Sequence, residues 1–124
     1  TELWLRAVDT VNGDITVTND GDIYIASGAI DADSANVVVD ATINAGGEIE
    51  VGGPGTAHII GHTIDLRAET GIANNDKLLI EGNELAATTV TGDINVRYIS
   101  GNLRIVDLSA PTATRAVSAV SGSG

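Results

Sequence analysis

A five-residue unit recurs along this chain and restricts the folds that the chain can adopt. Each copy holds a small residue, a polar residue and two apolar residues separated by one position, as in residues 13–17 (Gly-Asp-Ile-Thr-Val) and 21–25 (Gly-Asp-Ile-Tyr-Ile). Alternate side chains of a β-strand share a face, so each unit predicts a short strand whose apolar pair points inward. The predicted core residues are Ile15, Val17, Ile23, Ile25, Val37, Val39, Ile49, Val51, Ile64, Leu66, Leu78, Ile80, Ile94, Val96, Leu103 and Ile105.

The kind of apolar residue in the chain predicts a narrow interior. Hydrophobic residues make up 43% of the sequence, yet aromatics make up only 2%, and Phe, Met and Cys are absent. Large aromatic side chains fill space in most cores, whereas β-branched side chains fit the pleated surface of a strand. With 15 Gly for tight turns, we expect an all-β protein with many short strands.

Two all-β architectures fit strands that recur about every 8–16 residues. One is a parallel β-helix, or β-solenoid, of about four to five coils that stack on their neighbours. The other is a β-sandwich of pilin or adhesin type. The units resemble one another, and Tyr24 and Tyr98 are assigned to outward positions. Both observations favour the solenoid, because a sandwich core more often contains a buried Trp or Tyr.

The units divide the chain into a predicted solenoid domain, residues 1–109, and a different C-terminal segment, residues 110–124. The predicted coils are residues 11–32, 33–58, 59–88 and 89–109, with residues 1–10 as a partial coil. Residues 110–124 are rich in Ala, Ser, Thr and Gly and are predicted to be a tail or linker. The alternative is a final strand through Ala116, Val117 and Val120.

The charge of the chain excludes several classes of partner. The formal net charge is −11, from 17 acidic and 6 basic residues, so nucleic acid and anionic membrane surfaces are not expected partners. No apolar stretch approaches the roughly 20 residues that span a bilayer, so membrane insertion is not expected. The chain has no Cys and no Met. We therefore expect no disulfide framework, and we expect a processed product or part of a longer chain.

The Gly-Asp-Ile-x-Val units, found at residues 13–17 and 92–96, resemble the haemagglutinin-type repeats of filamentous haemagglutinins and related large bacterial adhesins. The resemblance covers roughly residues 11–108. It implies a right-handed parallel β-helix that acts as an extracellular shaft, with an extracellular or cell-surface location and a role in adhesion or surface display. Such shafts are far longer than this chain, and no secretion domain of that family is visible in it.

The ends of such a solenoid need a partner. A coil exposes apolar side chains and unpaired backbone edges unless a cap covers it, and no polar cap is evident at either end of the sequence. We expect the ends to stack on adjoining coils of a longer chain or on copies of this one. A head-to-tail contact that does not close produces a filament. A glycan or a host surface is the expected ligand.

Calcium is the one cofactor that the sequence suggests. Acidic residues open several units, and stacked coils would bring Asp14, Asp22 and Asp93 near one another. Calcium takes carboxylate oxygens and would relieve their repulsion. The alternative is that these side chains bond to backbone groups at turns, as Asp commonly does. The calcium-binding nonapeptide pattern of β-rolls is absent, so no metal or other cofactor is required.

No arrangement of residues predicts catalysis. Glu48 and Glu50 share a strand face about 7 Å apart, which suits an inverting glycosidase but also a solvated surface. His58 and His62 would lie about 13 Å apart on an extended strand, too far to chelate one metal unless a turn intervenes. Arg97 and Arg104 could neighbour each other on an outer face, but they are expected to pair with nearby acids such as Asp93 and Asp107.

The function expected from the sequence is therefore a structural or adhesive segment that is not an enzyme. Two alternatives stay open: a self-stacking subunit of an extracellular filament, and a carbohydrate-binding or polysaccharide-cleaving β-helix protein.

Overall fold

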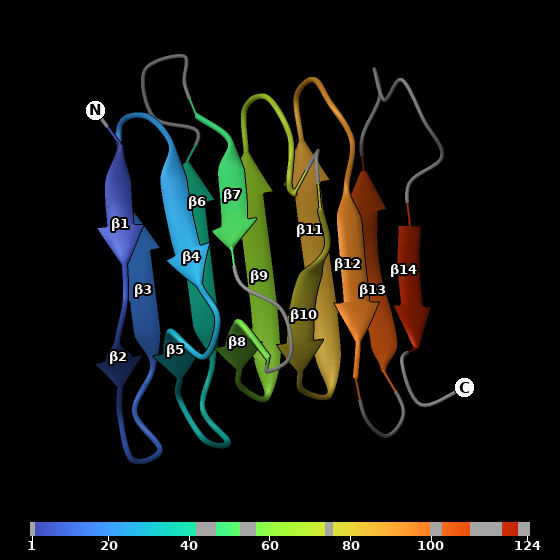
Figure 1. The fold of residues 1–124 in the computed structure, drawn as a ribbon. Helices are drawn as coiled ribbons and strands as arrows, with labels where there is room; N and C mark the ends of the chain where they lie inside the picture. Colours follow the sequence, from blue (N-terminus) through green and yellow to red (C-terminus); the bar gives the residue numbers. More distant parts are fainter. Residues whose placement is uncertain are drawn as a thin grey trace.

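The computed structural model of this chain contains strands and no helix among the residues it describes (Figure 1). No helix in that part of the chain is long and apolar enough to cross a membrane. The described residues are 2–41, 47–52, 57–73, 76–99, 103–109 and 118–121.

The strands form three sheets, and every described pair of neighbouring strands is parallel. The three-stranded sheet holds β1 (Leu3–Leu5), β4 (Ile23–Ala26) and β7 (Ile49–Gly52). The six-stranded sheet holds β2 (Val8–Asp9), β5 (Ile30–Asp31), β8 (Ile59–Ile60), β10 (Leu78–Glu81), β12 (Asn95–Tyr98) and β14 (Ser118–Ser121). The five-stranded sheet holds β3 (Ile15–Thr18), β6 (Val37–Ala41), β9 (Thr63–Ala68), β11 (Glu84–Thr89) and β13 (Arg104–Ser109). Sandwiches of the alternative type are antiparallel, so they do not account for this pairing.

Up to β9 the chain visits the three sheets in turn, and in the later rounds single bridges at Ile72 and Ile94 take the place of a strand of the three-stranded sheet. We call each round a level. The first level is β1, β2 and β3, and the second is β4, β5 and β6. Figure 1 shows successive levels following one another from the N-terminal to the C-terminal end of the stack. Residues paired between adjacent levels are 18 to 29 positions apart, from Leu78 with Val96 to Ile30 with Ile59. The spacing varies because the connecting segments differ in length while the strands stay in register.

The inward side chains form columns of like residues across the levels. Ile23 of β4 pairs with Ile49 of β7, and single bridges join Ile49 to Ile72 and Ile72 to Ile94. All four side chains are fully buried. Buried residues from all three sheets belong to one hydrophobic cluster, so the sheets share a single core. The cluster consists of Ile, Val, Leu and Ala, as expected, with Tyr98 as its one aromatic member among the described residues.

Most of the predicted core residues are buried, and four are not. Val17, Val51 and Leu103 are half-buried, and Ile105 is 46% exposed. Each lies on or beside the last described strand of its sheet: β3, β7 or β13. A side chain there is covered by a neighbouring strand on one side only, which explains its greater exposure.

The structure corrects the predicted coil of residues 59–88. Ile59 pairs with Ile80, and Ile64 pairs with Leu85, so this segment contains parts of two levels. The strand β11 was missed because its inward residues include Ala87, and it has no opening Gly. Its inward Leu85 and Ala87 are nevertheless fully buried.

Tyr98 and the C-terminal segment also differ from expectation. Tyr98 is only 5% exposed, because it lies two positions after Val96 and shares its inward face. Within the segment predicted as a tail, β14 pairs in parallel with β12 and extends the six-stranded sheet. Residues 110–117 and 122–124, with the proposed strand positions Ala116 and Val117, lie outside the described residues.

Candidate functional site

The acidic residues that open the units bond to the next level. The carboxylate of Asp14 accepts a hydrogen bond from the backbone N–H of Asn36 at 3.0 Å. The carboxylate of Asp22 accepts one from the N–H of Glu48 at 2.9 Å. These two Asp side chains therefore bond to backbone groups, as the alternative to a calcium site expected. The backbone groups belong to the neighbouring level and not to the local turn. Asp93 is buried at 4% exposure.

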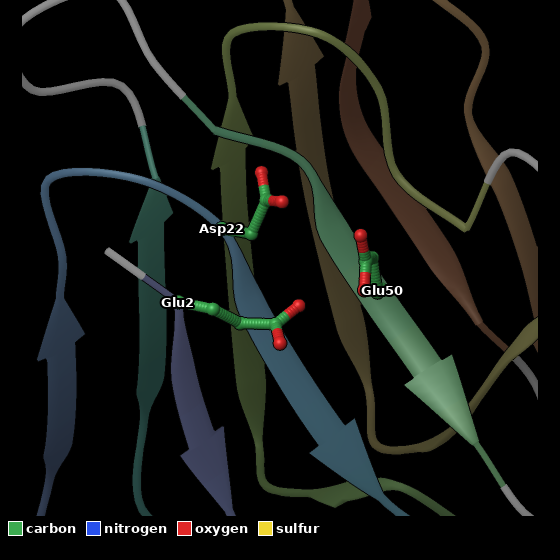
Figure 2. A group of neighbouring side chains, drawn as sticks. All are labelled: Glu2, Asp22 and Glu50. Atoms are coloured by element: carbon green, nitrogen blue, oxygen red, sulfur yellow. The ribbon is translucent and has the colours of Figure 1, made fainter.

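One acidic cluster lies on the outer side of the three-stranded sheet. Glu2 precedes β1, Asp22 precedes β4 and Glu50 lies on β7, and Figure 2 shows their side chains gathered across these three strands. One carboxylate oxygen from each lies within 4.8 Å of the others. Among the described residues this is the one group that meets the geometric requirement for a metal site. Of the three predicted calcium ligands, only Asp22 belongs to it.

Burial and neighbouring carboxyl groups raise the pKa of one member of this cluster. The pKa of Glu50 is raised from 4.5 to about 7. The largest cause is burial, which removes water from the carboxylate, followed by a hydrogen bond with the Glu2 carboxyl and by the charges of Glu2, Asp22 and Glu48. A hydrogen bond between two carboxyl groups needs one proton, and the raised pKa of Glu50 favours its protonated form.

An aromatic pair borders the acidic cluster. Trp4 and Tyr24 occupy paired outward positions on β1 and β4, and their rings stack with centroids 4.3 Å apart. Trp4 is 53% exposed and donates its indole N–H to Glu2. A β-carbon on Gly52 would collide with the Tyr24 hydroxyl, so the glycine is what lets the tyrosine lie across β7.

The outer side of the three-stranded sheet, which we call the aromatic–acidic face, therefore carries Trp4, Tyr24, Glu2, Asp22 and Glu50. Three carboxylates supply the oxygen ligands that Ca²⁺ prefers, although Ca²⁺ takes six to eight oxygens in all. An exposed indole supplies a flat apolar surface, and carboxylates accept hydrogen bonds from hydroxyl groups. Together these groups can contact a sugar ring.

The two glutamates considered for glycosidase catalysis lie in different surroundings. Glu50 belongs to the acidic cluster, where its carboxyl group is hydrogen-bonded to that of Glu2. Glu48 is not a member of that group of three, and its backbone N–H donates to the Asp22 carboxylate.

The two histidines have separate structural roles. His58 is buried, with Nε2 3.1 Å from the carbonyl oxygen of Gly52, while its Nδ1 accepts the backbone N–H of Leu79 at 3.0 Å. Accepting at Nδ1 places the proton on Nε2, which donates to Gly52. His62 is exposed and has Nδ1 3.1 Å from the Thr63 hydroxyl. The described residues therefore contain no zinc site built from this pair.

The predicted partner of Arg104 was wrong. The Arg104 guanidinium forms an ion pair with Glu84 at 3.3 Å and not with Asp107. Glu84 lies on β11, directly opposite Arg104 on β13. Arg97 is exposed on β12. Arg67 also forms ion pairs, with Asp65 and with Asp40.

The sequence reasoning missed Glu2 and Trp4 as members of a site. Neither belongs to a recurring unit, and residues 1–10 were treated as a partial coil. The useful signal is register: Trp4 stands one position after Leu3, which begins the column of Ile23 and Ile49. Aligning that column would have placed Trp4 opposite Tyr24, and Tyr24 opposite Glu50.

Comparisons of this chain with protein-family models, with curated proteins and with solved structures give no match. The resemblance to haemagglutinin-type repeats therefore stays a prediction, and the site is interpreted from its geometry.

Replacing Glu50 by Gln should change how stability depends on pH. A raised folded-state pKa means that the protonated carboxyl favours folding, fully below about 4.5 and progressively less as pH rises through about 7. Thermal unfolding of the unmodified chain should show this loss, whereas Glu50→Gln should lack it and be the more stable protein at about pH 8.

The matched control for this change is Glu69→Gln, which removes an acid outside the cluster. Its unfolding midpoint should follow the pH dependence of the unmodified chain. Parallel curves for Glu50→Gln and the unmodified chain would show that Glu50 does not hold an extra proton.

Proposed function

We propose that this chain is a structural and adhesive segment of an extracellular surface protein or fibre, folded as a right-handed parallel β-helix and without catalytic activity. The observation that supports this most directly is the stacking of like residues in register across three parallel sheets around one core. Such a stack needs no ligand, metal or disulfide. Its outward side chains can contact other molecules.

The closed β-helix is testable by methyl NMR. Ile23, Ile30 and Val37 lie in the same level but in different sheets, and all three are fully buried. If the sheets enclose a core, nuclear Overhauser contacts should join their methyl groups. Absence of contacts between sheets would contradict the closed solenoid.

The adhesive role uses the aromatic–acidic face. Carbohydrate binding is favoured there by one observation: the exposed Trp4 ring stands beside carboxylates that accept hydrogen bonds. Beads coated with the chain should adhere to glycan-coated surfaces, and Trp4→Ala should abolish most of that adhesion. Val106→Ala is a matched control, because Val106 is also exposed but lies on β13.

Absence of catalysis is tested in the same preparations. Incubation with neutral and acidic polysaccharides should release no new reducing ends. Release of reducing ends that disappears in Glu50→Gln would overturn the structural role and favour the polysaccharide-cleaving alternative. Equal adhesion by the unmodified chain and Trp4→Ala would remove the aromatic–acidic face from the adhesive role.

A further inference from the structure

Asn12 is the one asparagine of the chain that a glycine follows. It lies in the turn between β2 and β3, and its φ of 59° is in the left-handed region that Asn tolerates better than most residues. In an Asn-Gly pair, the backbone nitrogen of the glycine can attack the side-chain amide carbon, because the two atoms are held close and no β-carbon stands beside the nitrogen. This pair is therefore the position at which the chain most easily modifies itself.

The side-chain oxygen of Asn12 accepts two hydrogen bonds from the neighbouring level. The Ser34 hydroxyl donates to Oδ1 at 2.6 Å, and the Ser34 backbone N–H donates to it at 3.3 Å. Attack on the amide carbon moves negative charge onto this oxygen, and donors that are already in place stabilise charge that develops in such a step. The contact therefore favours the attack.

The attacking nitrogen of Gly13 is also held by a hydroxyl group. Its N–H donates to Oγ1 of Thr10 at 3.3 Å, and the same hydroxyl donates to the Gly13 carbonyl oxygen. A β-carbon at Gly13 would meet Thr10 at 3.5 Å, and no listed contact is closer, so the space beside the nitrogen is open. The nucleophile and the electrophile are thus each oriented by a side-chain hydroxyl.

The corner that carries these groups faces solvent. Asn12 and Ser34 are both exposed. Ser34 belongs to the second level, whose strands β5 and β6 each have a neighbour on both sides. Its exposure therefore comes from its place at an outer corner of the level and not from an open end of the stack. Water and hydroxide can reach the amide.

We propose that Asn12–Gly13 is a site of spontaneous self-modification, at which Ser34 of the neighbouring level promotes conversion of Asn12 to aspartate and isoaspartate. In the first step, the Gly13 nitrogen loses its proton to hydroxide and forms a bond to Cγ of Asn12. The bond between Cγ and Nδ2 then breaks, and Nδ2 takes a proton from water and leaves as ammonia. The product is a cyclic succinimide.

Water then opens the succinimide at one of two bonds. Cleavage between Cγ and the Gly13 nitrogen gives aspartate with an unchanged backbone. Cleavage between the main-chain carbonyl carbon and the Gly13 nitrogen gives isoaspartate, in which the chain continues through the former side chain. The reaction does not depend on the proposed adhesive role.

Both products alter the contact between the first two levels. Each adds a negative charge close to Asp14, and isoaspartate also lengthens the backbone just before β3. The Asp14 carboxylate accepts the backbone N–H of Asn36 at 3.0 Å. Isoaspartate should displace Asp14 from this bond, so amide hydrogen exchange at Asn36 should become faster.

Peptide mapping by mass spectrometry measures the reaction in the full chain. Samples are incubated at neutral and mildly alkaline pH, and aspartate and isoaspartate at position 12 are separated by chromatography and followed over time. Ser34→Ala removes the hydroxyl donor and should slow conversion in the folded chain roughly threefold to tenfold, the rate equivalent of one hydrogen bond. Ser34→Thr keeps a hydroxyl and should react at nearly the unmodified rate.

Two further comparisons separate the role of the Asn-Gly pair from that of the contact. In concentrated urea the contact between Asn12 and Ser34 is lost, so the unmodified chain and Ser34→Ala should react at equal rates. Gly13→Ala places a β-carbon beside the attacking nitrogen and should remove most of the product, folded or unfolded. Circular dichroism verifies that each variant is folded before the urea is added.

The outcomes distinguish promotion by the fold from protection by it. Equal or faster conversion in folded Ser34→Ala, with equal rates in urea, overturns the role of Ser34. A slow rate that folded Ser34→Thr shares with Ser34→Ala also overturns it. Conversion of Asn12 in urea without any in the folded chain overturns the site itself, because the fold then protects the amide.

Discussion

Ile49→Ala should lower the free energy of unfolding by about 2–5 kcal/mol, a large part of the stability of a domain of this size. Ile49 is fully buried and stands in the middle of the column that joins Ile23 to Ile72. Truncation there leaves a cavity between levels, and the strands on either side are held by their own hydrogen bonds and cannot close it. Urea unfolding monitored by circular dichroism measures the change.

The matched control is Ile105→Ala. Ile105 is paired with the buried Leu85 and so continues its inward column. It is nevertheless 46% exposed, because β13 is the last described strand of its sheet. Its truncation should cost less than about 1 kcal/mol, as is usual for partly exposed positions. Equal losses for the two variants would mean that the end level is as well covered as the interior.

Gly47→Ala should be the second strongly destabilising change, by about 1–3 kcal/mol or more. A β-carbon at Gly47 would lie 1.9 Å from the carbonyl oxygen and 2.2 Å from the carbonyl carbon of Gly21. Both are backbone atoms, so the two levels must separate. The same glycine accepts hydrogen bonds from the N–H groups of Glu69 and Thr70, which ties three levels together at this corner.

Gly13→Ala is the control for that change, because a β-carbon there would meet Thr10 at an ordinary 3.5 Å. Its melting temperature should stay near that of the unmodified chain. Amide hydrogen exchange should also separate the two: Gly47→Ala should speed exchange at Ile23, whose N–H donates to Glu48, and Gly13→Ala should not. Similar melting temperatures for both variants would contradict the close packing at Gly47.

The repeated units were sufficient to predict the strand type and the inward residues of the inner levels. They succeed where a strand has a Gly or polar opening and two β-branched residues, as in β4. They fail at β8, which has two residues, and at β11, where Ala replaces a larger inward residue. In both, the burial comes from the neighbouring levels and not from a strong local pattern.

The site was less predictable than the fold, for a physical reason. Glu2, Asp22 and Glu50 come from three different levels, and their meeting depends on the register between β1, β4 and β7. The segment that separates β4 from β7 differs in length from the one that separates β1 from β4. Spacing along the sequence therefore does not reveal which acids face each other, and the pair Glu48 and Glu50 was chosen on spacing alone.

The direction of the backbone hydrogen bonds has a mechanical consequence. Bonds between levels, such as His58 N–H to the carbonyl of Leu79, point along the stacking direction, because strands pair side by side. Tension along that direction loads one row of bonds at a time instead of shearing many rows together. A stack of levels pulled along this direction is therefore expected to yield level by level, and each step should release roughly 75 Å of extended chain. It lengthens progressively under load, and a surface fibre made of it would act as an extensible tether.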